Sequence, residues 1–319
     1  MFRFIRNHTF PIGVDMGDDA LKLVQLGSRG KGVVLLIAGG SENWPDGLKP
    51  GSGDWQRWAV KTIGEMMSNG KFRGKNIVAE MPSGEVFIDH IKRPKAADGE
   101  LAEAVFSEVK KKLPFEPDDA IMKYIPAEQD NVVVIANHRG KIDRHLAVYE
   151  QANLHVSSMG VWPIALINSY TRFFGRRKSD VEAVVMLLDI EANCTNVVIC
   201  RHKNLLFARS VPIGTRQLDG AAEDDEMMTR QLLELNACRR YFSSMYKNVQ
   251  IERTVFLSER AADRNICTTI AERLEMPAQM GDCLAAVEIP VDRDGSRMDR
   301  RECQVNWAAA FGLSLWNDR

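Results

Sequence analysis

The stretch AVVMLLDIEANCTNVVICRHKNLLFA, residues 183–208, decides the fold. It contains three short apolar runs, at 183–188, 197–200 and 205–208, which are separated by polar turns at 191–195 and 201–204. None of these runs is long enough for a helix, and turns follow one another too closely, which is typical of buried β-strands. We therefore expect a three-stranded meander with Asp189 at its first corner.

The N-terminal part of the chain repeats this plan. An apolar run at 12–16 carries Asp15, the turn Gly17-Asp18-Asp19 follows, and apolar runs at 21–26 and 33–38 flank a second turn at 27–32. The two segments align strand for strand and acid for acid. An internal repeat of this kind predicts a duplicated fold with an acid at the same corner of each half.

Several strings along the chain carry a family resemblance. They are IGVDMG (12–17), LKLVQL (21–26), IVAEMP (77–82), KLPF (112–115), VVVIA (132–136), LLDI (187–190) and RSVPIG (209–214). The paired meanders resemble the two phosphate loops of the actin-like ATPase superfamily. The strings resemble the PilM family of type IV pilus assembly proteins, which is similar to the cell-division protein FtsA. The resemblance covers nearly the whole chain and implies an α/β, actin-like (ribonuclease H-like, duplicated) fold with two lobes and a small inserted α/β subdomain.

The pattern of elements divides the chain accordingly. We expect residues 1–91 and 157–180 to form the first lobe, with a strand at 86–91, and residues 181–319 to form the second. The region 92–156 is expected to be the inserted subdomain, with a helix at 101–113, strands near 120–125 and 132–136, and a helix at 141–153. A C-terminal helix at 304–316 is expected to pack back on the first lobe.

The composition and charge of the chain exclude some classes of function. The 319 residues are 45% hydrophobic and 27% charged, which suffices for more than one core. A formal net charge of -1 argues against a nucleic-acid partner, which needs a basic excess. No long uncharged apolar run is present, so we expect no transmembrane helix. Together with the resemblance, this predicts a cytoplasmic protein peripheral to the inner membrane.

Neither the cysteines nor the histidines show a metal-binding spacing. The six cysteines form no C-x-x-C pair, and the six histidines form no H-E-x-x-H pattern. We therefore expect reduced cysteines and assign no metal to either residue type.

The family resemblance implies a nucleotide site at the two corners. In the family, loop amides and hydroxyls hold the phosphates of ATP, and an Asp at each corner positions a hydrated magnesium ion. Asp15 and Asp189 match those acids and are the candidate Mg ligands if Mg-nucleotide is bound. The full set of candidate cofactor-binding residues is Asp15, Gly17, Asp18, Asp189, Asn193, Thr195 and Ser258.

This chain departs from the family pattern at three points. Asp18 and Asp19 replace small hydroxyl residues in the first loop, Glu191 replaces a glycine in the second, and Glu259-Arg260 replaces a Gly-Gly turn near the adenosine. Like charges about 4 Å apart repel by about 4 kcal/mol at an effective dielectric near 20, which opposes a triphosphate. We expect a degenerate site and no catalytic residues, so an enzyme is the less favoured reading. Two alternatives stay open: Asp15, Asp18, Asp189 and Glu191 converge on a divalent cation, or they are exposed turn residues.

The function implied by the resemblance is scaffolding. PilM-like proteins bind the cytosolic N-terminal tail of the membrane protein PilN in a groove between the first lobe and the inserted subdomain, where backbone hydrogen bonds and side-chain pockets hold an extended peptide. The matching residues here are Met81, Pro82, Val86, Phe87 and Ile88. Other pilus or secretion platform proteins and self-association are further expected contacts. The alternatives are an active actin-like ATPase or filament protein, and a GspL-like cytoplasmic domain of type II secretion.

Overall fold

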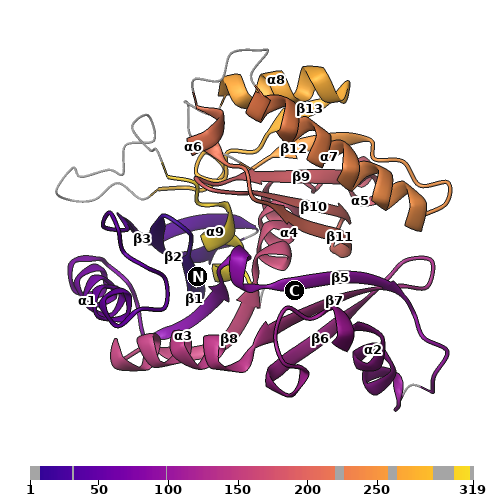
Figure 1. Cartoon of the computed structure of the whole chain (residues 1–319). Coiled ribbons are helices and arrows are strands. Elements are labelled where there is room, and N and C mark those ends of the chain that lie inside the picture. The colour runs from indigo at the N-terminus through magenta and orange to yellow at the C-terminus, as the bar shows by residue number, and fades with distance from the viewer. Residues whose placement is uncertain are drawn as a thin grey trace, which may run out of the picture.

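The first lobe is built on a five-stranded mixed sheet of order β3-β2-β1-β4-β8 (Figure 1). The computed structural model describes residues 8–30, 32–97, 99–219, 226–257, 264–289 and 305–316. β1 pairs antiparallel with β2 and parallel with β4. The strands are β1 (His8–Met16), β2 (Ala20–Arg29), β3 (Val33–Asn43), β4 (Asn76–Met81) and β8 (His155–Val161).

The second lobe repeats this plan strand for strand, in the order β11-β10-β9-β12-β13. β9 pairs antiparallel with β10 and parallel with β12, as β1 does with β2 and β4. The strands are β9 (Val184–Ile190), β10 (Thr195–Arg201), β11 (Asn204–Val211), β12 (Arg253–Phe256) and β13 (Ala278–Met280). The predicted duplication and the actin-like fold class are therefore confirmed.

The central strands are buried on both faces, which explains why their sequences read as continuous apolar runs. Every residue of β9, and the first eight of β2, are buried. Strands covered on both sides lose the alternation of polar and apolar residues that marks a half-exposed strand. The predicted strand at 33–38 is longer than expected, because β3 continues through Gly39 and Gly40 to Asn43 along β2.

A separate three-stranded sheet of order β5-β7-β6 forms the subdomain. Its elements are β5 (Phe87–Lys92), β6 (Ala120–Ala127), β7 (Asn131–His138) and helix α2 (Leu101–Val109). The sequence analysis assigns the strand at 86–91 to the first lobe, and that assignment is wrong, because β5 pairs antiparallel with β7 along its whole length. An isolated strand pattern shows that a strand exists but not which partner it has.

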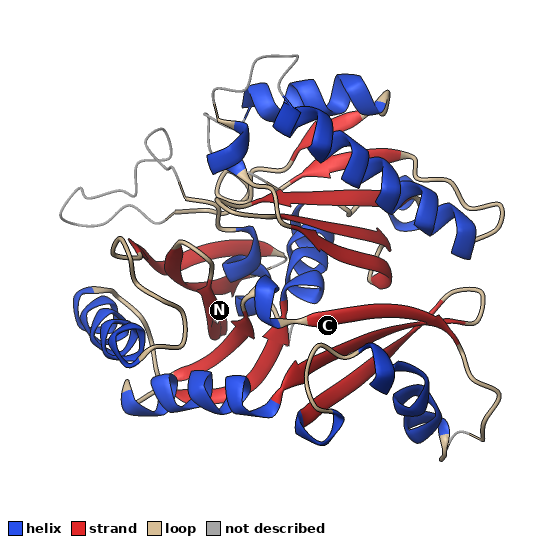
Figure 2. Ribbon diagram, in the orientation of Figure 1, coloured by secondary structure: helices blue, strands red, loops and turns tan. Residues whose placement is uncertain are grey.

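Helices cover the outer faces of both large sheets (Figure 2). α1 (Gly53–Asn69) and α3 (Arg139–Gln151) pack over the first sheet, while α7 (Glu226–Met245) and α8 (Arg264–Leu274) pack over the second. The assignment of the helix at 141–153 to the subdomain is therefore also wrong. Val148 and Tyr149 of α3 are buried in the core that β1, β2 and α1 share.

Two helices, α4 (Trp162–Phe173) and α9 (Ala308–Ser314), join the lobes through one common core. α9 packs on α4 and on β1 and β2 of the first lobe. Glycines allow this close approach: a side chain at Gly13 would collide with the backbone of Ala310, and one at Gly312 with that of Ala165. The sequence analysis did not assign α4, although its apolar residues recur with a helical period and nine of its twelve residues are buried.

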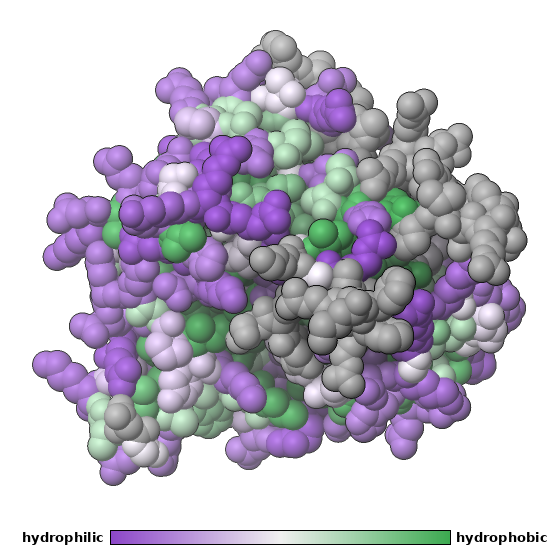
Figure 3. Space-filling view, turned by 180° about the vertical axis from the view of Figure 1, so that it is seen from behind, coloured by the Kyte–Doolittle hydropathy of each residue, from purple (hydrophilic) through white to green (hydrophobic). Residues whose placement is uncertain are grey.

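Shorter elements connect these layers. They are the 3-10 helices Ser83–Glu85, Lys110–Lys112 and Pro117–Asp119, with α5 (Lys178–Glu182) and α6 (Thr215–Leu218). The cap of α1 differs from the expectation of Asp54: Ser52 is the N-cap, and its hydroxyl accepts the Trp55 N–H at 3.2 Å. In the view of Figure 3, hydrophilic residues predominate over much of the surface. Within the described ranges, no helix combines the length and the apolar character that crossing a bilayer requires.

Candidate functional site

The two predicted corner acids lie on opposite lobes and are buried. Asp15 on β1 is 3% exposed, and Asp189 on β9 is 1% exposed. The hairpin turns that follow these strands approach each other, since Cys194 of the second turn donates to Asp18 of the first across 3.6 Å. The repeat therefore brings its two corners together at the junction of the lobes.

The side chain of Lys22 fills the space between the corners. Its Nζ lies 2.9 Å from Asp15 Oδ2 and 3.3 Å from Glu191 Oε1, and its side chain is 3% exposed. A buried ammonium is costly unless it is paired. Burial alone would lower the pKa of Lys22, but the charge of Asp15 and the hydrogen bond with it raise this pKa well above its usual value, and Glu191 adds to the shift when it is ionised. Lys22 is therefore a charged bridge between the first lobe and the second.

Asp189 is satisfied by two amides. Its Oδ1 accepts from Asn306 Nδ2 at 2.5 Å, and its Oδ2 accepts from Asn196 Nδ2 at 3.1 Å. Asn306 Nδ2 also lies 3.4 Å from Glu191 Oε1. Asn306 precedes α9, so the C-terminal part of the chain completes the contact between the corners.

The remaining carboxyl groups of this cluster resist ionisation. Burial raises the pKa of Glu191 to about 8, although the Lys22 charge opposes the shift. Burial, the charge of Asp15 and a hydrogen bond with Asp15 raise the pKa of Glu80, on β4, well above its ordinary range. At neutral pH the cluster therefore carries fewer negative charges than its carboxyl groups would suggest, and Lys22 balances part of them.

The other predicted phosphate-binding residues do not converge on the corners. Thr195 is fully buried, donates its hydroxyl to Ile213 O at 2.8 Å and accepts from Gln231 Nε2 at 2.9 Å, so this hydroxyl is not free for a phosphate. Asn193 accepts from Arg216 Nη1 at 3.3 Å. Gly17 lies in the first turn, where an added Cβ would come 3.9 Å from Lys22 Nζ. Ser258 and the turn Glu259-Arg260 lie outside the described residues.

These residues do not fit a hydrated magnesium ion in their present arrangement. Magnesium takes carboxylate, phosphate or water oxygens in octahedral geometry, whereas the position between Asp15 and Glu191 is taken by an ammonium. Among the described residues, no group of three or more His, Cys, Asp or Glu side chains is placed to hold a metal ion. The alternative in which four acids converge on a divalent cation is also corrected, because Asp18 turns away to a different cavity.

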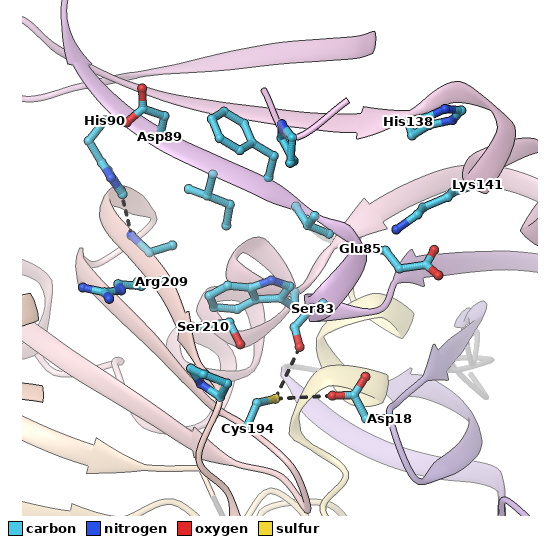
Figure 4. A pocket seen from close by; sticks show the side chains of 18 of the residues that line it. Asp18, Ser83, Glu85, Asp89, His90, His138, Lys141, Cys194, Arg209 and Ser210 are labelled. Carbon is cyan, nitrogen blue, oxygen red and sulfur yellow. Dashed lines mark hydrogen bonds between the residues drawn. The ribbon is translucent and has the colours of Figure 1, made fainter. Parts of the chain in front are cut away.

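That second cavity is a groove of about 920 Å³ between the subdomain and the second lobe (Figure 4). β5 and β11 line it, and each is the edge strand of its own sheet. The groove walls are mainly apolar. The apolar side chains that line it are Val86, Phe87, Ile88, Pro114, Phe115, Trp162, Phe207, Ala208 and Pro212.

One end of the groove is closed by His90. Its ring stacks on Phe207 with centroids 4.6 Å apart, and its Nε2 accepts the Ala208 N–H at 3.1 Å. Tyr241 Oη donates to the His90 carbonyl at 3.4 Å. Burial lowers the pKa of His90 to about 4, so the ring is neutral at pH 7 and can act as the acceptor. This contact holds the subdomain against the second lobe.

The opposite end of the groove lies at the hairpin turns. Cys194 Sγ lies 3.3 Å from Ser83 Oγ and 3.6 Å from Asp18 Oδ2 (Figure 4). Of the predicted partner-binding residues, Val86, Phe87 and Ile88 line the groove. Met81 is buried at the end of β4 and Pro82 follows it, and neither residue is part of the groove wall.

Sequence reasoning missed Lys22, Glu80, His90 and Trp162. Lys22 and Glu80 are single charges inside apolar strands, LKLVQL and IVAEM. A lone charge within a strand that is otherwise continuously apolar is a signal of a buried ion pair or hydrogen bond, because an unpaired charge there would be costly. His90 and Trp162 had no comparable signal, since their partners lie far away in the sequence.

The model of the type IV pilus assembly protein PilM family matches residues 13–225. The chain belongs to this family. A solved structure of a PilM-PilN type IV pilus biogenesis complex is 21% identical and superposes with a TM-score of 0.75, covering 96% of this chain and 98% of that one. No protein of curated function matches the chain by sequence.

Two more distant structures share the fold. The cytoplasmic domain of EpsL, an inner-membrane component of the type II secretion system of Vibrio cholerae, is 8% identical with a TM-score of 0.51, covering 98% of this chain and 96% of that one. A Bacteroides thetaiotaomicron protein with an actin-like ATPase fold is 8% identical with a TM-score of 0.50, covering 88% and 92%. At these identities the likeness concerns the fold alone.

Proposed function

We propose that this PilM-family chain is a cytosolic scaffold of a type IV pilus inner-membrane platform, which holds the extended cytosolic tail of a PilN-like membrane protein in the groove between β5 and β11. One observation carries the proposal: the groove is bordered by two strand edges that have no strand partner in the described sheets. An extended peptide gains backbone hydrogen bonds at such an edge and side-chain pockets beside it. The anchoring partner would keep the protein at the cytoplasmic face of the inner membrane.

The apolar groove wall supports this proposal. Val86, Phe87 and Ile88 are each only partly buried, although their side chains are large and apolar. Exposed apolar surface in a hollow is typical of a binding site for protein or ligand. The related structure of a PilM-PilN complex is the one in which a partner of this kind is named.

The corner cluster supports a role that does not depend on nucleotide turnover. In this proposal the Lys22 ammonium stands where a magnesium–nucleotide would bridge the lobes, and it pairs with Asp15 of one lobe and Glu191 of the other. Its pairing gives the two lobes a permanent link within the chain. An active actin-like ATPase, or a filament driven by ATP, is the less favoured alternative on this ground.

A type II secretion platform is the second candidate. The shared fold with the cytoplasmic EpsL domain favours it. The same groove would then hold a segment of a different membrane protein. Genomic neighbours and partner binding distinguish the two systems, whereas the fold does not.

The test is direct binding of the full chain to a synthetic peptide with the sequence of the N-terminal tail of the PilN-like protein from the same genome. We expect saturable binding in fluorescence anisotropy and none to a scrambled peptide. Phe87→Asp places a charge in the groove and should weaken binding by about tenfold or more. The matched control Val33→Asp, at the exposed start of β3, should leave it unchanged. Equal affinity for the native and scrambled peptides contradicts the proposal.

A further inference from the structure

One of the residues that line the groove carries a buried hydrogen-bond donor without an acceptor. Trp162, the first residue of α4, is 2% exposed and lines the groove. Its indole Nε1–H has no acceptor among the described residues. A buried indole N–H usually has a hydrogen-bond partner, and leaving a buried donor unpaired costs about 1–3 kcal/mol. A ligand in the groove that presents an acceptor would remove this cost.

The same groove contains a carboxylate without a cationic partner. Asp18 accepts only the weak S–H donor of Cys194, and no Lys, Arg or His in the described part of the chain forms an ion pair with it. Burial and the neighbouring Asp19, Asp15 and Glu85 raise the pKa of Asp18. An incoming cation would relieve this repulsion.

The other acids of the groove are already compensated. Asp89 lies 2.8 Å from Lys112 Nζ, and Glu85 lies 3.2 Å from His145 Nε2. Figure 4 shows Asp89 and Asp18 at opposite ends of the groove. The uncompensated negative charge is therefore confined to the end formed by the hairpin turns.

We infer that this end of the groove is a subsite for a basic side chain of the bound tail, which Asp18 receives, and that the Trp162 indole N–H donates to a carbonyl of the same extended segment. The inference rests on the proposed function and specifies the chemistry of its partner. Every residue of an extended peptide carries a carbonyl, and a Lys or Arg side chain supplies the cation. Asp18 and Trp162 thus determine the position and the specificity of the tail.

A metal ion is not the occupant that these observations favour. Asp18 is a single carboxylate, and no metal-holding group of side chains occurs among the described residues. A divalent cation prefers several oxygen ligands. An unpaired donor and a carboxylate among the lining residues of one groove suit a peptide, which carries an acceptor together with a charge.

The experiment measures the affinity of the fluorescein-labelled tail peptide for four variants of the full chain. Asp18→Asn keeps the shape and removes the charge, and we expect affinity to fall about tenfold, since buried charge pairs across interfaces contribute strongly. Trp162→Phe keeps the ring and removes the donor, and we expect a loss of about two- to tenfold. The matched controls are Asp143→Asn on the exposed side of α3 and Trp58→Phe on α1.

A second peptide, in which norleucine replaces the basic residue, completes the test. It should bind the wild-type chain about tenfold more weakly than the native peptide, and Asp18→Asn should not weaken it further. If the native peptide binds and both groove variants bind within twofold of wild type, the inference is overturned while the proposed function stands. If only one variant loses affinity, the role of the other residue is overturned. If the wild-type chain binds no peptide, the proposed function fails and the inference fails with it.

Discussion

Asp15 and Asp18 stand three residues apart in one hairpin, yet they have opposite surroundings. The side chain of Asp15 is buried at the junction of the lobes, where Lys22 Nζ lies 2.9 Å from its Oδ2. Asp18 turns into the groove, where no basic residue of the described chain pairs with it. The difference teaches that the first acid contributes to the folded state itself, whereas the second remains free to interact with a partner.

The cluster around Lys22 and the groove also differ in how their polar groups are paired. The cluster around Lys22 contains acids from both lobes and an amide from the C-terminal segment, and hydrogen bonds join Lys22 to Asp15 and Asp189 to Asn196 and Asn306. The groove contains an unpaired donor and two open strand edges. A network of paired polar groups stabilises one conformation, whereas a ligand can supply the partner that an unpaired donor lacks.

The largest expected effect comes from removing the cation. Lys22→Met should lower the free energy of unfolding by about 3–5 kcal/mol, because it leaves buried carboxylates without their partner. Urea denaturation followed by circular dichroism measures the change. The control Lys61→Met removes an exposed ion pair of α1 and should cost less than about 0.5 kcal/mol. Equal losses in the two variants would contradict the account of Lys22.

A smaller effect is expected at the closed end of the groove. His90 has a pKa of about 4 in the folded chain, against about 6.5 when unfolded. The unfolded chain therefore binds more protons between these values, so the contribution of His90 is complete above pH 6.5 and is lost as the pH falls towards 4. This contribution amounts to about 3 kcal/mol.

His90→Gln keeps an acceptor and does not titrate, so it isolates this contribution. Its unfolding free energy should fall less than that of wild type between pH 7 and pH 4. The control His155→Gln, at an exposed position on β8, should follow the wild-type curve. Parallel curves for wild type and His90→Gln would show that the pKa of His90 is the same in the folded and the unfolded chain, which contradicts this account.

Replacing Glu191 tests whether Lys22 needs this second acid in ionised form. Its pKa of about 8 keeps the group mostly protonated at pH 7, so Glu191→Gln should change stability there by less than about 1 kcal/mol. Because the folded pKa is raised, wild type loses stability as the pH rises from about 4.5 through 8, and the variant should lose less. Urea titrations at pH 6 and pH 9 measure this. A loss of several kcal/mol at pH 7 would instead identify an ionised partner of Lys22.

The smallest effect is expected for Asp18→Asn in the absence of partner. The raised pKa of Asp18 means that its charge is disfavoured in the folded chain at neutral pH. Removing the charge should therefore raise the unfolding free energy slightly, within about 0.5 kcal/mol. Urea denaturation of both variants measures the contrast with Asp15→Asn, which should lower the unfolding free energy. If both substitutions destabilise to the same extent, the distinction between the two acids is lost.

Most of the fold could be predicted from the sequence, but less of the candidate site could. The duplicated meanders could be predicted because their strands are short, apolar and regularly separated by turns. α4 was not assigned, although its apolar residues recur with a helical period. The subdomain boundary was misplaced because strand pairing between 87–92 and 131–138 is a tertiary choice.

At the candidate site, the sequence predicted that Asp15 and Asp189 lie at strand ends and Val86 to Ile88 near the crossing into the subdomain, whereas their binding roles stay predictions. Lys22 and Trp162 were not found, because their roles depend on residues more than a hundred positions away. Lys22 meets Glu191, and Trp162 shares its groove with Asp18. Thr195 was assigned wrongly, because only the structure shows that its hydroxyl is used by Ile213 and Gln231.

The central claim is that Lys22 links the lobes in place of a magnesium–nucleotide. Isothermal titration of the full chain with Mg-ATP, together with a thermal melt at saturating nucleotide, tests it most directly. We predict no heat of binding and no shift in a melt that remains cooperative. Saturable binding, with stabilisation of about 2.7 kcal/mol at a hundredfold excess over the dissociation constant, would contradict the claim and restore a nucleotide to the junction of the lobes.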